Sequence, residues 1–289
     1  MIETKTNINW YPGHMKKTMD MIVEQLKQID VVIEILDARI PLSSRNPEIN
    51  NIVKNKTRII ILNKVDLVEQ KDFIKWKQYF LEEGVDYIIA LSAEKGTNLK
   101  ELKTYIKKLY DIKLEKMKKK GLRKTQIRAM ILGIPNVGKS RLINKLANKS
   151  KAGVGNLPGF TRGKQWISVD ENFFILDTPG VLWPKFNSHE VALNLAITGS
   201  IKDEVVAIEE VASSLLQKMK EFSIIDRVYM AYNLTKEEDD DIYALMKKIE
   251  KRLLINTKEL DYEIVSKRIL RDFRQGKFGK FFLELPERK

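Results

Sequence analysis

The stretch IILNKVDL, residues 60–67, places an apolar run directly before a polar loop. Three further runs have the same form: DVVIEILDAR at 30–39, DYIIALSA at 86–93 and IRAMILG at 127–133. Short, β-branched runs of this kind are typical of strands buried on both faces. The four runs therefore predict neighbouring strands of one parallel sheet, each ending in a polar loop.

Helical patterns fill the intervals between these strands. They lie at 71–83 and 98–110, and the second places Leu99, Leu102, Ile106 and Leu109 on one face. After the fourth strand we expect a helix over KSRLINKLANK (139–149), and KQWISVDENFFILD (164–177) predicts a hairpin that turns at 170–172. The sequence thus predicts an α/β fold with a mostly parallel six-stranded sheet and right-handed crossovers.

The strand pattern stops at about residue 188. Helical periodicity follows in VASSLLQKMKEF (211–222), DDDIYALMKKIEKRLL (239–254) and DYEIVSKRILRDFRQ (261–275). We expect two domains: residues 1–187, an α/β domain with an N-terminal arm, and residues 188–289, an all-helical domain. The basic segment KLEKMKKKGLRK (113–124), between the second helix and the fourth strand, is interpreted as a solvated linker.

The composition limits the class of protein. The 289 residues are 43% hydrophobic and 31% charged, which is typical of a globular protein. No apolar run is long enough for a membrane span, and MIETKTNINW lacks the core of a signal peptide, so we expect a cytoplasmic location and no membrane partner. The absence of cysteine excludes disulfides and thiolate sites. A formal charge of +13 favours a polyanionic partner such as nucleic acid, although an AT-rich coding bias gives the same lysine excess.

The segment GIPNVGKS (133–140) fits the phosphate-binding pattern G-x-x-x-x-G-K-[ST] between a strand and a helix. Gly133 and Gly138 allow the backbone N–H groups to face a β-phosphate. Lys139 brings an ammonium to the β- and γ-phosphates, and the Ser140 hydroxyl can bind Mg²⁺. The other expected nucleotide-binding residues of this segment are Pro135, Asn136, Val137 and Arg141.

Asn63, Lys64 and Asp66 of NKVD indicate that the base is guanine. The Asp66 carboxylate can accept from both N1–H and the exocyclic amine of guanine, a donor pair that adenine lacks. Lys64 is expected along the base, and Asn63 is expected to tie its loop to the phosphate loop. In SAEKG (92–96), Ser92 and Ala93 would support the base through backbone contacts. Alone, NKVD could be an ordinary strand exit, but its position after a buried strand favours base recognition.

The segment DTPG (177–180) closes the predicted hairpin. Asp177 would hold Mg²⁺ through water, and the Gly180 N–H would meet the γ-phosphate. Upstream, GNLPGFTRG (155–163) offers Thr161 as the threonine that closes over Mg²⁺ in the triphosphate state. Together these motifs predict GTP and GDP as ligands and Mg²⁺ as the metal.

The motifs stand in an unusual order. GTPases ordinarily run from the phosphate loop through the switch threonine, DxxG and NKxD to SA, whereas here the last two come first. We interpret this order as a circular permutation, which can preserve a site because the termini of such domains lie close together at the surface. The chain after DTPG then runs straight into the helical domain, so we expect nucleotide state to be transmitted there.

Several segments together resemble the RbgA (YlqF) family of ribosome-biogenesis GTPases: NWYPGHMKK (9–17), LDARIPLSSRNP (36–47), GIPNVGKS and DTPGVLWPK (177–185), in permuted motif order. The resemblance is dense over the first 200 or so residues. It implies a cytoplasmic GTPase of low intrinsic rate, stimulated by the ribosome, that acts late in maturation of the large (50S) ribosomal subunit. It also implies binding to ribosomal RNA in the GTP state, release on hydrolysis, and a monomer when free; DNA is not an expected partner.

The resemblance also implies roles for single residues. Val181 follows DTPG, where many GTPases have a glutamine that orients the attacking water, and the family places the histidine of WYPGHM, His14, in that role. Without the family, His14 after Pro12–Gly13 would be a turn residue. Asn136 matches a residue that helps to bind K⁺ in potassium-stimulated GTPases. Arg141 departs from the family's threonine and would strengthen nucleotide binding or face outward.

The segment 261–282 mixes basic and aromatic residues, which suits RNA backbone and unpaired bases. It also fits an amphipathic helix with Ile264, Ile269 and Phe273 in the core, and both interpretations can hold on opposite faces. Two other functions stay open at this point. One is a P-loop kinase, against which NKVD and SAEKG count; the other is a nucleotide-gated RNA-binding module with negligible hydrolysis, which Val181 favours.

Overall fold

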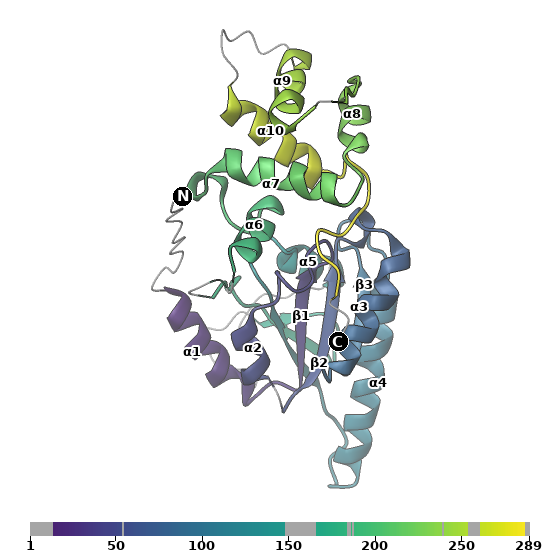
Figure 1. The fold of residues 1–289 in the computed structure, drawn as a ribbon. Helices are drawn as coiled ribbons and strands as arrows, with labels where there is room; N and C mark the ends of the chain where they lie inside the picture. The colour runs from purple at the N-terminus through teal and green to yellow at the C-terminus, as the bar shows by residue number, and fades with distance from the viewer. Residues whose placement is uncertain are drawn as a thin grey trace. The chain divides into compact units, whose positions relative to one another are not determined.

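The computed structural model describes residues 14–53, 55–147, 166–183, 186, 188–238, 240–253 and 261–286, with the backbone alone for 14–16. Over this part the chain forms two compact units (Figure 1). We call the described residues up to 183, together with 284–286, the sheet unit, and Phe186–Leu283 the helical unit.

The sheet unit alternates strands and helices along the chain. Its strands lie in the order β3-β2-β1-β4-β6-β5 across one six-stranded sheet. Its elements are α1 (His14–Leu26), β1 (Val31–Asp37), α2 (Pro47–Ile52), β2 (Thr57–Asn63), η1 (Val65–Leu67), α3 (Gln70–Glu82), β3 (Tyr87–Leu91), α4 (Leu99–Lys118), β4 (Ile127–Leu132), α5 (Lys139–Leu146), β5 (Trp166–Ser168) and β6 (Phe173–Leu176).

The pairing of the strands confirms the predicted α/β architecture. All neighbours are parallel except β5, which pairs antiparallel with β6. The predicted turn joins these two strands, and the Asn172 N–H donates to the Asp170 carboxylate within it (2.8 Å). Since β1, β2, β3 and β4 are parallel neighbours, the loops that follow them emerge at one edge of the sheet.

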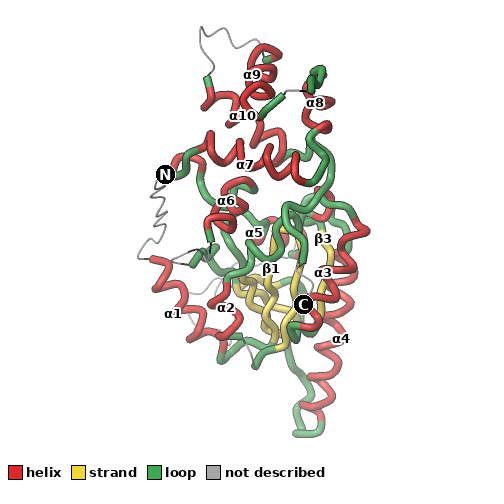
Figure 2. The backbone as a smooth tube through the Cα atoms, viewed as in Figure 1, coloured by secondary structure: helices red, strands yellow, loops and turns green. Residues whose placement is uncertain are grey.

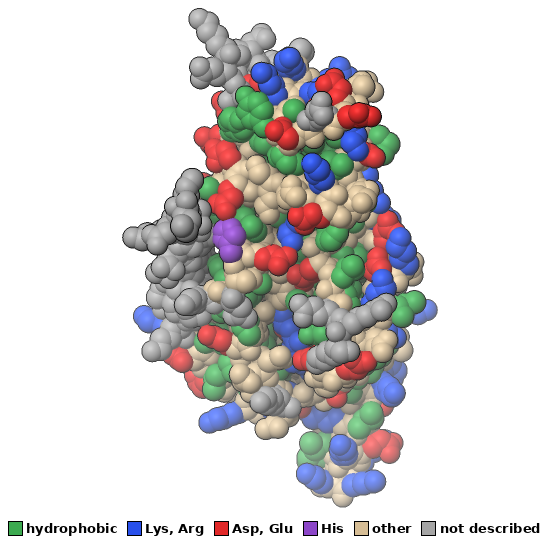
Figure 3. All heavy atoms as spheres, viewed as in Figure 1, with side chains coloured by type: hydrophobic (Ala, Val, Ile, Leu, Met, Phe, Trp, Pro, Cys, Tyr) green, Lys and Arg blue, Asp and Glu red, His purple; other side chains and the backbone are tan. Residues whose placement is uncertain are grey.

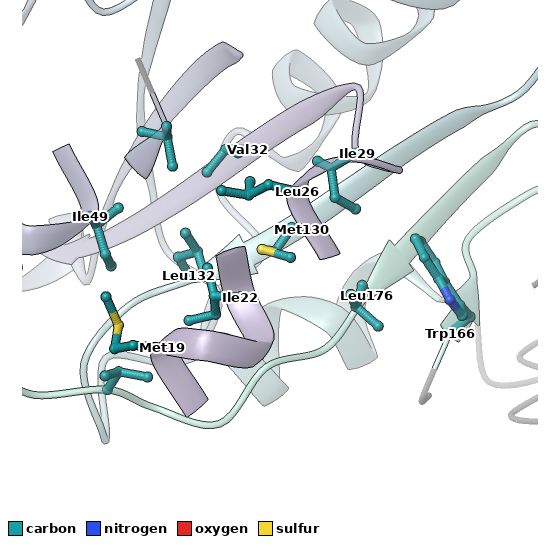
Figure 4. Packing of buried hydrophobic residues seen from close by; sticks show 12 residues of the cluster. Met19, Ile22, Leu26, Ile29, Val32, Ile49, Met130, Leu132, Trp166 and Leu176 are labelled. Carbon is teal, nitrogen blue, oxygen red and sulfur yellow. The ribbon is translucent and has the colours of Figure 1, made fainter. Parts of the chain in front are cut away.

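Helix α1 is held by its apolar face. Met19, Ile22 and Leu26 join a buried cluster with residues of β1, β4 and β6 (Figure 4). The cluster also contains Val181, the residue after DTPG. A hydrophobic contact therefore links the helix that begins at His14 to the segment that follows β6.

Helix α4 corrects one prediction. It runs to Lys118, so the first half of the basic segment 113–124 is helical and not a linker. Lys113 stabilises this extension by contacts to the Asp30 carboxylate (2.6 Å) and the Gln126 carbonyl (2.9 Å). Lys116 and Lys118 lie in the last turn, where positive charge complements the helix dipole. Figure 3 shows Lys and Arg side chains gathered at this end of α4.

The described part of the helical unit contains helices and loops (Figure 2). Its elements are α6 (His189–Ile197), η2 (Asp203–Val205), α7 (Ile208–Glu221), α8 (Asp226–Tyr232), α9 (Ile242–Arg252) and α10 (Tyr262–Arg274). Helix α10 packs on α7, and Arg274 donates to the Ala196 and Ile197 carbonyls (2.8 and 3.0 Å) at the end of α6. The same guanidinium pairs with Asp203, the first residue of η2. Arg274 therefore supplies donors to the free carbonyls at the end of α6 and holds the start of η2 beside them.

The core of α10 differs from the prediction at one position. Ile269 and Phe273 are buried as expected, whereas Ile264 is 48% exposed, and its assignment to the core is wrong. Ile264 lies in the first turn of α10. The Asp261 side chain caps this helix by accepting from the Ile264 N–H (3.0 Å). Among the described residues, no helix combines the length and apolarity of a membrane span.

Candidate functional site

The phosphate loop connects β4 to α5 and depends on backbone that only glycine permits. A Cβ on Gly133 would lie 2.6 Å from the Ile35 carbonyl oxygen. Gly138 has φ 104°, and a Cβ there would collide with the Asn63 amide. The loop therefore closes against β1 and β2, and its backbone enters the N-terminus of α5, where N–H groups and the helix dipole favour an anion.

Lys139 is the buried cation of this loop. Its Nζ donates to the Gly133 and Ile134 carbonyls (both 2.9 Å), and the residue is 7% exposed. Burial lowers the pKa of Lys139 to about 8, while nearby Asp177 opposes the shift. An ammonium held in this way can neutralise phosphate oxygens at neutral pH.

The DTPG segment after β6 is fastened to the phosphate loop. The Thr178 hydroxyl donates to the Ile131 carbonyl (2.5 Å), and the Val181 N–H donates to the Gly133 carbonyl (3.2 Å). A Cβ on Gly180 would lie 2.8 Å from Lys139 Nζ and from the Pro135 backbone. Gly180 thus brings its backbone against the same loop that carries Lys139.

Two oxygen-bearing side chains near Lys139 could bind Mg²⁺. Ser140 is exposed at the start of α5, and Asp177 is half-buried at the end of β6. Burial raises the pKa of Asp177, and the Lys139 ammonium partly reverses this effect. A hydroxyl and a carboxylate are hard oxygen donors of the kind that Mg²⁺ prefers next to phosphate, so the residues present fit the ion.

Asn63 joins the loops after β2, β3 and β4. Its Nδ2 donates to the Val137 carbonyl (2.7 Å), which confirms the expected tie to the phosphate loop. Its Oδ1 accepts from the Ala93 N–H (2.9 Å). One buried side chain therefore holds three segments that are up to 74 residues apart in sequence.

The carboxylate of Asp66 is arranged to receive hydrogen-bond donors. Its Oδ1 is buried and, within the described part of the chain, has no hydrogen-bond partner, while Oδ2 lies 3.9 Å from Lys95 Nζ. An unpaired buried acceptor is costly, and a guanine base offers two adjacent N–H donors to such a carboxylate.

Ser92 and Ala93 shape the loop after β3. The Ser92 hydroxyl accepts from the Lys95 N–H (3.1 Å), and its carbonyl accepts from the Gly96 N–H (2.7 Å). Because the Ala93 N–H is bonded to Asn63, the loop after β3 is joined to the end of β2 through this side chain.

Arg141 faces outward. It is exposed and forms an ion pair with Glu94, in the loop after β3. Of the two alternatives for this residue, the structure favours a surface position, in a contact between α5 and the loop after β3. Asn136 is likewise exposed and has φ 57°.

The structure does not report on two predicted site residues. Thr161 lies outside the described residues, and His14 is described only as the first residue of α1.

Sequence reasoning missed one residue of this region, Asp37, which accepts from Lys64 Nζ (2.8 Å). The available signal was its position as the last residue of a buried strand at the same sheet edge.

The chain matches two family models, several curated proteins and several solved structures. The family model described as 50S ribosome-binding GTPase matches residues 128–258, and the model described as ethanolamine utilisation - propanediol utilisation matches 2–108. Ribosome biogenesis GTPase A of Bacillus cereus is 45% identical over 97% of this chain and 94% of its own length. The protein of that name in Bacillus licheniformis is 43% identical over 97% and 99%. The crystal structure of GNP-bound YlqF from T. maritima has the same fold, with a TM-score of 0.64, 24% identity and coverage of 94% and 99%.

Proposed function

Because this chain belongs to the ribosome biogenesis GTPase A family, we propose that its GTPase cycle controls late assembly of the large (50S) ribosomal subunit. The chain is a GTPase of ribosome biogenesis. The finer proposal is that it binds ribosomal RNA of the 50S subunit in its GTP state and leaves after hydrolysis. We place this activity in the cytoplasm and expect a monomer when the protein is free.

The observation that best supports guanine as the base is the buried, unpartnered Oδ1 of Asp66. In the proposed complex this carboxylate accepts from N1–H and the exocyclic amine, and Lys64 lies along the base. Asn63 keeps the base-reading and phosphate-binding loops together through its two hydrogen bonds. Ser92 and Ala93 complete the base side.

The proposed phosphate side uses backbone groups and one cation. Backbone N–H groups of the loop from Gly133 to Arg141, among them those of Asn136, Val137 and Gly138, surround the α- and β-phosphates. Pro135 has no N–H and contributes to the shape of the loop. Lys139 leaves its two carbonyl partners to neutralise the β- and γ-phosphates, and the Gly180 N–H donates to the γ-phosphate. Ser140, Asp177 and Thr161 hold Mg²⁺, which when bound supplies further charge neutralisation. Asn136 would serve a K⁺ ion.

Hydrolysis requires a water that attacks the γ-phosphorus while the bond to the β–γ bridging oxygen breaks, giving GDP and phosphate. Val181 cannot orient this water, since its side chain is apolar and buried in the cluster that holds α1. We propose that His14 does so when the N-terminal arm is ordered on the ribosome. The anchoring of α1 beside Val181 supports this assignment, because His14 begins that helix.

We further propose that the chain divides into a permuted GTPase domain, 1–187, and an RNA-binding helical domain, 188–289. The excess of 13 positive charges supports contact with RNA in general, because lysine and arginine that neutralise phosphates release counterions. The exposed cations of α10, among them Arg271, belong to the second domain.

Nucleotide-dependent sedimentation tests this proposal. The protein is centrifuged with purified 50S subunits in the presence of a non-hydrolysable GTP analogue or GDP. We expect it to pellet with the subunits in the analogue and to stay in the supernatant in GDP. An Asp66→Ala variant, which loses base recognition, should stay in the supernatant in both. Equal pelleting of the wild type in both nucleotides would contradict a GTP-controlled cycle.

A further inference from the structure

A buried ion cluster lies at the end of β1, beside residues 63–66, the loop after β2 that we propose reads the base. The Asp37 carboxylate accepts from the Arg39 N–H (3.0 Å), from Arg39 Nε and Nη2 (2.9 and 2.7 Å) and from Lys64 Nζ (2.8 Å). Asp37 pairs in register with Asn63 of β2, which brings it next to Lys64. Asp37 is fully buried, whereas the Lys64 side chain is 24% exposed at the edge of the cluster.

The charge on Asp37 is permanent at working pH. Burial by itself raises the pKa of Asp37, but the Arg39 guanidinium and the Lys64 ammonium outweigh it and hold that pKa below the usual range. Lysine carries its charge on a flexible four-carbon stem. A fixed anion at the tip orders that stem, and in the proposed complex the stem lies along the guanine ring.

The backbone of Asp37 is itself held by the loop that follows β1. Its N–H donates to the Ser44 hydroxyl (3.0 Å). The same loop is bound by the carboxylate of Glu284, near the end of the chain: Oε1 accepts from the Leu42 and Ser43 N–H groups (2.5 and 3.0 Å), and Oε2 accepts from the Ser43 hydroxyl (2.5 Å). Glu284 follows directly on Leu283, the last residue of the helical unit.

We propose that Asp37 is a positioning residue that sets the place of Lys64 for guanine recognition, and that Glu284 keeps Asp37 in place by holding the loop 41–44. This inference rests on the proposed nucleotide site. The path from the chain end to the base runs through Glu284, Ser43, Ser44, Asp37 and Lys64. Its consequence is that a side chain more than 200 residues from NKVD in sequence contributes to guanine-nucleotide affinity.

Fluorescence titration with N-methylanthraniloyl GDP tests the path in the full-length protein. We expect Asp37→Asn to weaken binding about tenfold or more and Glu284→Gln to weaken it a few-fold, since each removes hydrogen bonds to a charged group. Both substitutions are then made in a Lys64→Met background. There we expect each to change affinity by less than about twofold, because the residue through which they act is gone.

Non-additivity separates this role from general damage to the fold. Asp37→Asn leaves Arg39 buried without its carboxylate and can destabilise the sheet unit, so thermal unfolding is followed in parallel; Glu284→Gln leaves that cluster intact and is the second, independent variant. Matched controls are Asp72→Asn and Glu82→Gln, which alter exposed contacts on α3 and should bind as wild type.

Three outcomes decide the inference. Wild-type affinity in either Asp37→Asn or Glu284→Gln overturns it. Equal losses with and without Lys64 also overturn it, because the residues would then act structurally. A wild-type protein that binds no GDP would remove the proposed function as well, and is thereby distinguished from failure of the inference alone.

Discussion

The two sides of the candidate site are built in different ways. On the base side, side chains form the links: Asn63 bonds to two loops, and Lys64 is paired with Asp37. On the phosphate side, the contacts are made by the backbone, and Gly133, Gly138 and Gly180 lie so close to neighbouring atoms that none has room for a Cβ. A side-chain contact can be weakened gradually by different substitutions. Where the backbone leaves no room for a Cβ, even the smallest substitution causes a clash. Substitutions should therefore have graded effects on the base side and severe ones on the phosphate side.

Gly180→Ala should break the phosphate side most severely. The new Cβ would lie 2.8 Å from Lys139 Nζ and from Pro135 backbone atoms that cannot yield cheaply. We expect GTP turnover to fall about a hundredfold, the usual cost of a misplacement near 1 Å. Gly84→Ala is the control: Gly84 has a positive φ, which Gly180 does not, but nothing lies within 4 Å of its added Cβ, so this variant carries backbone strain without a clash. If Gly180→Ala hydrolysed GTP as fast as Gly84→Ala, the phosphate side would be more tolerant than its geometry indicates.

Asp66→Asn should change specificity on the base side without loss of the fold. The amide N–H faces the N–H groups of guanine, so we expect GDP affinity to drop by about tenfold or more. Xanthine has a carbonyl where guanine has its amine, and xanthosine diphosphate should bind the variant better than the wild type. Competition titrations with both nucleotides measure the switch. A variant that still prefers GDP would show that Asp66 does not read the base.

The pKa of Lys139 predicts how GDP affinity on the phosphate side depends on pH. Burial lowers it to about 8, and a bound phosphate must raise it again. Below pH 8 the amine is already charged and affinity for GDP is flat; above pH 8 binding must take up a proton, so affinity should fall by up to tenfold per pH unit.

Titrations between pH 6.5 and 9 measure this slope. Lys139→Arg provides the control, because a guanidinium stays charged and any contribution from the base itself is common to both proteins. Equal slopes for the two proteins would contradict the assignment of the titration to Lys139.

Sequence patterns predicted the parts of the molecule that depend on local rules. The strand at 58–66 was predictable from its β-branched run, and the phosphate loop from glycines that no other residue replaces. The extension of α4 to Lys118 was not predictable. A lysine-rich segment has no clear apolar face, and this one is held by the contact of Lys113 with Asp30, which is distant in sequence. The Asp37–Lys64 pair depends on the register between β1 and β2, and the Glu284 contact on the path of the whole chain. For the first, the sequence offers only the position of Asp37 at the end of a buried strand, and the Glu284 contact has no local signal.

GTP hydrolysis by the wild type, with and without purified 50S subunits in potassium buffer, tests the central claim most directly. We expect slow turnover of the free protein and stimulation of at least about tenfold by the subunits, lost in His14→Ala although GTP binding is kept. An unchanged rate on adding subunits, despite tight GTP binding, would contradict the proposal that the ribosome completes this site.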